Sequence, residues 1–167
     1  MKIYTKSGDN LQTSTFNDNR VYKNDIIIEI NGTIDELQSS LMIAYNFVIQ
    51  DDIKDILLRI CKQLYSLGYS ISSQQVILTA NDVENIESLI DTYQQNLPNL
   101  NDFVYPGLTK EASFIHMART ICRRVERLLI SFYLDHEIIK FNLQYINRLS
   151  DLLYILALNV DEIKIIK

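Results

Sequence analysis

Four arginines lie within nine residues, Arg119–Arg127 ("RTICRRVER"), of a chain whose formal net charge is −5. At about 100° per helical residue, Arg119, Arg123 and Glu126 share one side of a helix with His116. That side flanks the apolar stripe of the same helix, which consists of Ile115, Ala118, Cys122, Val125 and Leu129. Guanidinium groups bind phosphate or carboxylate through paired hydrogen bonds. The spacing therefore favours an anion-binding site beside the core, at a position that a docking subunit could cover.

A second interpretation of this segment is an ordinary solvated face, because runs of charge on helices are usually exposed. Arg123 then has Glu126 and Arg127 as helical neighbours and no ligand. Against this, Arg119 and Arg123 are like charges at i,i+4, an arrangement that is mildly destabilising in an isolated helix. An anionic partner would remove that cost, but the residues alone leave both interpretations open.

Two other segments carry polar side chains suited to a ligand. In Tyr4–Phe16 ("YTKSGDNLQTSTF"), a glycine, several hydroxyls and a lysine could present backbone N–H groups and charge to phosphate. This is not a Walker loop, because no Gly-Lys-Ser/Thr sequence opens a helix, and a polar, frayed terminus is the alternative. In Ile146–Leu153 ("INRLSDLL"), Asn147, Ser150 and Asp151 share one face, and serve either a ligand or helix–helix hydrogen bonds.

The elements that position these segments are expected to be helices. A chain of 167 residues with four glycines and two prolines suggests a single domain, 1–167, built of long helices. We expect an all-α fold, a five-helix bundle with ferritin-like up-down packing, which occupies residues 33–158 between an irregular N-terminal arm (1–32) and a tail (159–167). Within the arm, Ile26–Ile30 is a β-like run. Apolar spacing predicts helices at Thr33–Ile49, Ile53–Ile71, Asn81 to before Pro98, Thr109–Tyr133 and Ile139–Leu158. Capping boxes are expected at the first and third helices, where Thr33 pairs with Glu36 and Asn81 with Glu84.

Composition narrows the class of protein. Hydrophobic residues make up 47% and charged residues 22%, as in ordinary globular proteins, and the acidic balance argues against nucleic-acid binding. No apolar run is long enough to span a membrane and the N-terminus lacks a signal-peptide core, so we expect a cytoplasmic protein without a membrane partner. Cys61 and Cys122 are expected to be buried, reduced thiols, since two cysteines and two histidines at unrelated spacings form no zinc signature.

Six segments together resemble the PduO-type cobalamin adenosyltransferases: "YTKSGD…TSTF", "RVYKND", "GTIDELQSS", "FVYPG", "RTICRRVER" and "YINRLSDLLYILA". Their order and spacing fit the family over nearly the whole chain. The resemblance implies a five-helix bundle that assembles as a homotrimer with active sites between subunits. It also implies transfer of the 5′-deoxyadenosyl group of ATP to the cobalt of cob(I)alamin, giving adenosylcobalamin and triphosphate, with Mg²⁺ accompanying the ATP. A reductase and a cobalamin-dependent acceptor enzyme would be its protein partners.

The same resemblance assigns roles to individual residues. The implied nucleotide-binding residues of the arm are Thr5, Lys6, Ser7, Gly8, Thr13, Ser14 and Lys23. Those of the helical side of a neighbouring subunit are Arg123, Arg124, Glu126, Arg127 and Asn147. The implied catalytic set is Arg123, Arg119, Asp35 and Phe103. In that set, Asp35 pairs with Arg119 across the interface, and Phe103 stacks under the corrin and displaces its lower axial ligand. No residue is assigned to the metal.

The chemistry agrees with these roles. Cob(I)alamin is itself the nucleophile, so the chain needs no Ser-His-Asp or Cys-His arrangement. The leaving triphosphate is a concentrated anion, and cations fixed where its charge develops stabilise it. Lys6, Lys23 and the arginines supply that charge together with Mg²⁺. Glu126 could orient the guanidinium groups or hold the water shell of the metal.

Three positions depart from the usual sequence of the family. Leu11 stands where a second glycine is usual, Gln38 where asparagine is usual, and Leu108 where the loop has Gly-Gly. If position 11 requires a positive φ, leucine would strain the loop by roughly 1–3 kcal/mol.

These departures motivate an alternative function, a catalytically weakened module that binds ATP or adenosylcobalamin to deliver or sense the coenzyme. A third hypothesis is a structural bundle whose arginines only form salt bridges between subunits. A di-iron bundle is excluded, because the chain has no Glu-x-x-His pair.

Overall fold

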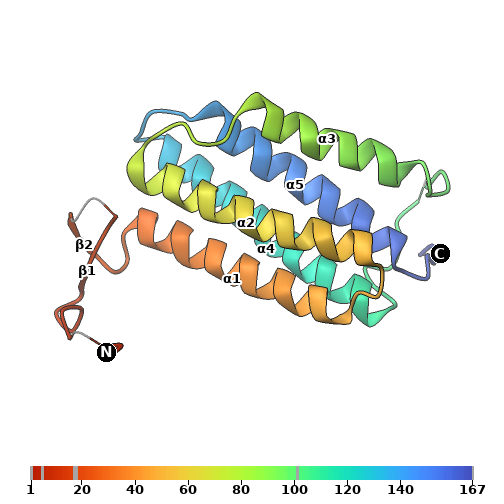
Figure 1. Cartoon of the computed structure of the whole chain (residues 1–167), viewed down its shortest axis with the longest axis horizontal. Coiled ribbons are helices and arrows are strands. Elements are labelled where there is room, and N and C mark those ends of the chain that lie inside the picture. The colour runs from red at the N-terminus through yellow and green to blue at the C-terminus, as the bar shows by residue number, and fades with distance from the viewer. Residues whose placement is uncertain (1, 5, 17–18, 101, 167) are drawn as a thin grey trace.

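The computed structural model describes residues 2–4, 6–16, 19–100 and 102–166. Within them the chain forms five long helices and one two-stranded sheet (Figure 1). The elements in chain order are β1 Gln12–Ser14, β2 Arg20–Tyr22, α1 Ile26–Phe47, α2 Asp51–Ser73, α3 Ala80–Gln94, α4 Lys110–Tyr133 and α5 Lys140–Asn159. Each helix runs antiparallel to the one before it, which confirms the predicted five-helix, up-down bundle.

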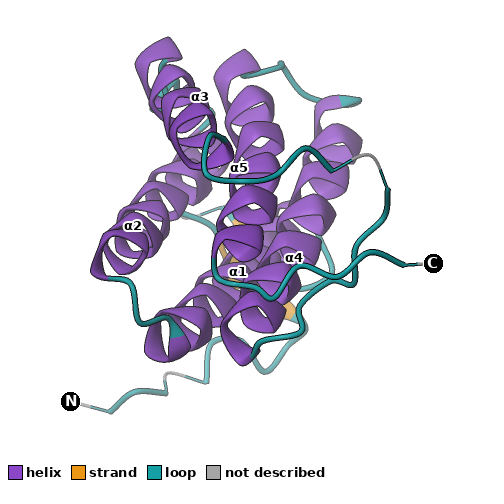
Figure 2. Ribbon diagram, turned by 90° about the vertical axis from the view of Figure 1, so that its right-hand side faces the viewer, coloured by secondary structure: helices purple, strands orange, loops and turns teal. Residues whose placement is uncertain are grey.

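Three helices, α1, α4 and α5, form the centre of the packing. Helix α1 packs against α2 and α4, α4 also packs against α5, and α5 packs against α3 (Figure 2). Each helix buries a stripe of aliphatic side chains between its neighbours, as Leu37, Leu64, Val125 and Leu149 do without any exposed area. Helix α4, which carries the four arginines, therefore has one side against α1 and another against α5.

The first helix begins earlier than the sequence predicts. Asp25 is its N-cap, and the carboxylate of Asp25 accepts a hydrogen bond from the backbone N–H of Ile27 at 3.0 Å. Thr33, the predicted start, lies inside the helix and donates its hydroxyl to the carbonyl of Glu29 at 2.8 Å. The predicted β-like run at Ile26–Ile30 is thus wrong, and so is the arm boundary at residue 32. Ile30 is fully buried and its neighbours pack on the core, so tertiary packing outweighs the preference of β-branched residues for strands.

The third helix also begins earlier than predicted. Its capping box joins Thr79 and Asp82, with the backbone N–H of Thr79 donating to the carboxylate of Asp82 at 2.9 Å. The predicted box of Asn81 with Glu84 is therefore wrong by two residues. The predicted ends of the second, fourth and fifth helices agree with the structure to within about two residues, the normal uncertainty of a helix end.

The N-terminal arm contains a small antiparallel sheet that the sequence did not predict. Thr13 pairs with Val21 and Ser14 with Arg20. Arg20 also donates from Nη2 to the carbonyl of Ser7 at 2.8 Å, which ties the preceding turn to the sheet. The arm lies at the end of the bundle where α1 begins (Figure 1).

Neither cysteine in the described chain is in a disulfide; Cys122 is buried and Cys61 is half-buried. Burial raises the pKa of both thiols. The expected burial is confirmed for Cys122 and is only partial for Cys61. Among the described helices, none combines the length and apolar character needed to cross a membrane.

Candidate active site

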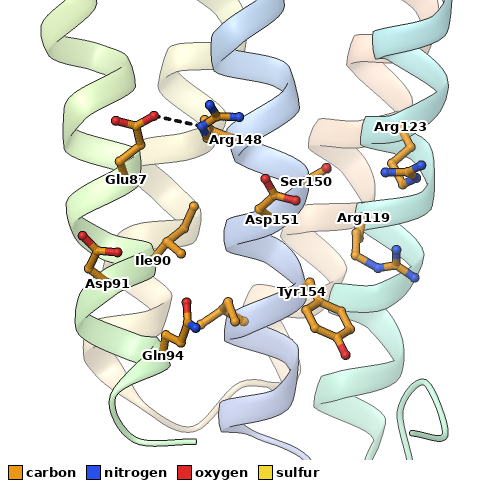
Figure 3. Close-up of a pocket in the computed structure, with 11 residues that line it drawn as sticks. Glu87, Ile90, Asp91, Gln94, Arg119, Arg123, Arg148, Ser150, Asp151 and Tyr154 are labelled. Carbon is orange, nitrogen blue, oxygen red and sulfur yellow. Dashed lines mark hydrogen bonds and ion pairs between the residues drawn. The ribbon is translucent and has the colours of Figure 1, made fainter. Parts of the chain in front are cut away.

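A cleft of about 570 Å³ lies along α5, between α3 on one side and α4 on the other (Figure 3). Its charged and polar lining residues are Arg119, Arg123, Arg148, Glu87, Asp91, Gln94, Ser150 and Asp151. Tyr154, Ile90 and Ile155 form its apolar part. The cleft thus combines cations, carboxylates and an aromatic surface, and Figure 3 shows the two α4 arginines one turn apart beside Asp151 and Tyr154.

Arg119 is held in place by two neighbours. Its Nε donates to Nδ1 of His116 at 3.3 Å, and its guanidinium carbon lies 5.8 Å from the centre of the Tyr154 ring. Burial and then the positive charge of Arg123 lower the pKa of Arg119. An anion bound between Arg119 and Arg123 would relieve that repulsion.

The other three arginines of the motif differ in what their side chains contact. Arg123 is exposed, and its guanidinium makes no hydrogen bond or ion pair with any described residue, so it is available to a ligand. Arg124 forms an ion pair with Glu36 of α1 at 2.6 Å. Arg127 donates to the carbonyl of Arg123 at 3.0 Å, and both its side chain and that of Arg123 face solvent.

The predicted partners on α5 meet the arginine helix directly. Nδ2 of Asn147 donates to Oε1 of Glu126 at 2.9 Å. Ser150 lines the cleft and donates its hydroxyl to the carbonyl of Asn147 at 2.9 Å. Asp151 lines the same cleft. Of the face predicted from the sequence, Asn147 therefore forms a helix–helix contact, and Ser150 and Asp151 line the cleft.

Among the described residues of the arm, those predicted to bind nucleotide lie in or against the turn around Gly8 and in the strand β1. A Cβ on Gly8 would lie 3.2 Å from Nζ of Lys23, so the lysine ammonium packs closely against this glycine. Lys6 has φ 60°, Thr13 and Ser14 form β1, and Ser7 is bonded through its carbonyl to Arg20. Thr5 lies outside the described residues. No described residue of the arm lines the arginine cleft, so one chain does not bring the two predicted halves of the nucleotide site together.

Asp35 and Arg119 also lie apart in one chain. Asp35 is exposed in a groove between α1 and α2, next to Gln38, Tyr69 and Phe16 of the arm. Arg119 lines the cleft on α4. A pairing between them is therefore a prediction about an assembly of chains.

Phe103 is 87% exposed in the loop before α4. Main-chain hydrogen bonds join this loop to the tail, from Tyr105 N to the carbonyl of Lys164 at 3.1 Å and from Ile166 N to the carbonyl of Phe103 at 2.9 Å. Asp161 completes the junction by accepting from the N–H groups of Leu108 and Thr109 at 2.8 and 2.9 Å. The loop thus presents an aromatic ring to solvent from a fixed backbone.

The three departures from the family sequence have different structural consequences. Leu11 has φ 63°, the left-handed conformation that leucine adopts only with strain. Leu108 is not among the described residues with positive φ, whereas Gly107 has φ 93°, so of these two positions only 107 requires glycine, and it has one. Gln38 donates from Nε2 to the carbonyl of Cys61 at 3.0 Å and helps to join α1 to α2.

Sequence reasoning missed two arginines and one carboxylate that support the site. Arg20 binds the turn of the arm, and Arg148 lines the cleft and forms an ion pair with Glu87 at 2.8 Å. Both arginines lie within motifs that carried the resemblance, but their partners lie 13 and 61 positions away, beyond the reach of a helical or strand period. Among the described residues, no group of three or more His, Cys, Asp or Glu side chains is placed to hold a metal ion.

Comparison with known proteins decides the family. A family model described as cobalamin adenosyltransferase matches residues 3–160. This chain belongs to the cobalamin adenosyltransferase family. It is 37% identical over 163 residues to a corrinoid adenosyltransferase of Citrobacter freundii, with 93% of each chain covered. It is 36% identical to a corrinoid adenosyltransferase of Bacillus subtilis, covering 94% of this chain and 85% of that one.

Longer and solved members of the family give the same result. The chain is 33% identical to the corrinoid adenosyltransferase PduO of Salmonella typhimurium and spans 49% of its length. A variant of the PduO-type ATP:corrinoid adenosyltransferase from Lactobacillus reuteri, complexed with cobalamin and ATP, has a TM-score of 0.92 at 28% identity, with 99% of both chains covered. A second variant from that organism, complexed with ATP, has a TM-score of 0.91 at 29% identity, covering 99% of this chain and 100% of that one.

The buried His116 predicts a pH dependence of stability. The residue is 4% exposed, and burial, followed by the charge of Arg119, lowers its pKa, while Asp161 of the tail acts in the opposite direction. The Nε2 atom has no hydrogen-bond partner among the described residues, and Tyr154 of α5 packs beside the ring. The unfolded histidine binds a proton more readily than the folded one. The contribution of His116 to the free energy of unfolding is therefore fully present above about pH 6.5 and is lost as the pH falls.

We expect the melting temperature of His116→Asn, which keeps an acceptor near Arg119 but cannot titrate, to fall less between pH 7 and pH 5.5 than that of the wild type. Differential scanning fluorimetry in matched buffers measures both slopes. Equal slopes in the two proteins would show that His116 does not contribute to the pH dependence.

Proposed function

We propose that this chain transfers the 5′-deoxyadenosyl group of ATP to the cobalt of cob(I)alamin and releases triphosphate. The observation that carries the proposal is its match, over nearly the full length of both chains, to a solved enzyme complexed with cobalamin and ATP. The arginine cleft supports it, because it contains the cations of Arg119 and Arg123, and Arg123 forms no ion pair with a described residue.

The reaction forms one bond and breaks one bond. The electron pair of cobalt(I) attacks C5′ of ATP, the Co–C bond forms, and the bond between C5′ and the α-phosphate oxygen breaks. The electron pair of that bond leaves with triphosphate, so negative charge develops on the oxygen. In our proposal Arg123 stabilises that oxygen, because preorganised cations act most strongly where charge develops, while Arg119 pairs with Asp35 of a neighbouring subunit.

The remaining residues bind and orient the nucleotide in this proposal. Lys6, Ser7, Gly8, Thr13, Ser14 and Lys23 would hold the phosphates from the arm, as would Thr5, while Arg124, Glu126, Arg127 and Asn147 would hold the nucleotide from the helices. Mg²⁺ would enter with ATP and keep the phosphates and water as its main ligands. Phe103 would pack against the corrin and exclude water from the lower face of the cobalt.

We further propose a homotrimer with active sites between subunits. The separation of the arm from the cleft, and of Asp35 from Arg119, supports this, since a second chain would have to complete each site. Exposed apolar side chains on α1 and α4 support it too: Ile43, Phe47, Met117 and Ile130 are 39–50% exposed in one chain. Sedimentation analysis tests the assembly, and a monomer at working concentration would contradict it. The reductase, the acceptor enzyme and the cytoplasmic location stay predictions.

An anaerobic assay tests the activity. The protein is mixed with MgATP and chemically reduced cobalamin, and the light-sensitive absorption spectrum of a Co–C bond is followed. A thermal shift with MgATP is measured in parallel, because ligand binding to the native state raises stability. Nucleotide binding without any Co–C product would refute the catalytic claim.

The conformation of Leu11 is the observation that favours the second candidate, a coenzyme-binding module with weak catalysis. Its φ is 63°, in the left-handed region where a leucine is expected to be strained. The residue is also 73% exposed, so little packing compensates for the strain. Tight binding of adenosylcobalamin without turnover would support the module.

Replacing Leu11 with glycine tests whether this strain limits the enzyme. We expect Leu11→Gly to lower the KM for ATP several-fold, because relief of strain of roughly 1–3 kcal/mol favours the closed turn of the arm. Leu11→Ala is the matched control, since it removes the side chain but keeps a Cβ at positive φ. If both variants improve equally, the side chain and not the backbone conformation is responsible.

A further inference from the structure

A continuous line of polar contacts crosses three helices beside the cleft. Oε1 of Glu87 on α3 binds Nε of Arg148 on α5 at 2.8 Å (Figure 3). Nη1 of Arg148 donates to Oδ1 of Asn147 at 2.6 Å, and Nδ2 of Asn147 donates to Oε1 of Glu126 on α4 at 2.9 Å. The line therefore begins on a helix outside the predicted nucleotide site and ends on two members of it.

This line fixes the direction of the Asn147 amide. An asparagine side chain has an oxygen that only accepts and a nitrogen that only donates. Because Arg148 occupies the oxygen, the nitrogen is turned toward the carboxylate of Glu126. The reverse orientation would place the amide oxygen against that carboxylate and the amide NH₂ against the guanidinium, and both contacts would be repulsive.

We propose that Arg148, oriented by Glu87, is a positioning residue that holds Asn147 and Glu126 in the geometry required for the nucleotide. This inference rests on the proposed function, because it concerns the same site. The guanidinium uses two different nitrogens, one for Glu87 and one for Asn147, and a lysine ammonium lacks that planar fork. The side chains of Arg148 and Glu87 are 40% and 45% exposed, and ion pairs at such positions contribute little to stability.

The dissociation constant for MgATP, measured by calorimetry, tests this role without requiring turnover. We expect Arg148→Ala and Glu87→Gln each to raise it about 10-fold, with Arg148→Lys close to Arg148→Ala. Glu84→Gln makes the same chemical change at an exposed position of α3, and should leave the constant unchanged. If Arg148 instead bound phosphate directly, Glu87→Gln would free its charge and tighten binding, which would overturn the proposal.

A double-mutant cycle shows whether Arg148 acts through its neighbour. In an Asn147→Ala background, Arg148→Ala should have little further effect on the dissociation constant. An undiminished loss in that background would contradict the positioning role.

A third measurement needs no ligand and separates this inference from the proposed function. The side-chain NH₂ of Asn147 should exchange its hydrogens more slowly in the wild type than in Arg148→Ala, as seen by NMR. Equal exchange would refute the inference even for an active enzyme. Slow exchange in a wild type that does not bind ATP would refute the proposed function but leave the amide orientation established.

Discussion

Arg123→Ala is expected to lower kcat/KM for ATP by about 100-fold or more, the loss typical of removing one preorganised donor from a developing charge. The melting temperature should change by no more than about 2 °C, because the exposed guanidinium of Arg123 has no partner among the described residues. Steady-state kinetics with reduced cobalamin and a thermal scan at one protein concentration measure the two quantities.

Arg123→Lys is the matched variant for this prediction. It keeps the positive charge but loses the planar donor fork, so we expect activity between that of the wild type and that of Arg123→Ala. If the alanine variant lost activity only in proportion to lost stability, Arg123 would be a structural residue and the cleft would need a different occupant.

Gly107→Ala is expected to destabilise the protein by about 2–4 kcal/mol. Gly107 has φ 93°, and an added Cβ would lie 2.6 Å from Cα and 2.7 Å from N of Ser113. These are backbone atoms of the first turn of α4, so rotation of a side chain cannot relieve the contact. The loop that carries Phe103 would have to move, and corrinoid use should suffer more than ATP binding.

Gly32→Ala is the control for that substitution. Gly32 lies inside α1 and a Cβ there would meet no atom within 4 Å, so alanine should stabilise the helix by about 0.5–1 kcal/mol. Thermal denaturation at equal protein concentration compares the two variants with the wild type. A Gly107→Ala protein as stable as the wild type would mean that the loop has another conformation.

The fold could be predicted where local pattern and tertiary packing agree. The α4 segment combines a capping threonine at position 109 with an unbroken apolar stripe, and its predicted bounds were correct to one residue. The α1 start could not be predicted in this way, because Ile26–Ile30 has strand-like residues and becomes helical only when Ile30 is buried between neighbours. The two strands of the arm were missed because each has three residues, too few for a periodic signal.

The site could be predicted only in part, for a related reason. Helical spacing placed Arg119, Arg123 and Glu126 on one side of α4, and Asn147 does contact Glu126. The link from Glu87 to Arg148 joins side chains 61 positions apart, and no local pattern specifies that distance. The sequence could also not show that Arg124 forms an ion pair with Glu36 on α1, since a bound ligand could equally have been the partner of that guanidinium.

The junction between the Phe103 loop and the tail has a consequence for how the family can diverge. Residues 103–105 and 164–166 are joined through peptide groups, which nearly every amino acid supplies. The side chains of residues 164–166 in the tail can therefore vary without loss of this backbone pairing. Asp161 is the exception, because its carboxylate accepts from three backbone N–H groups. Evolutionary constraint on the tail should therefore concentrate on this one acidic residue.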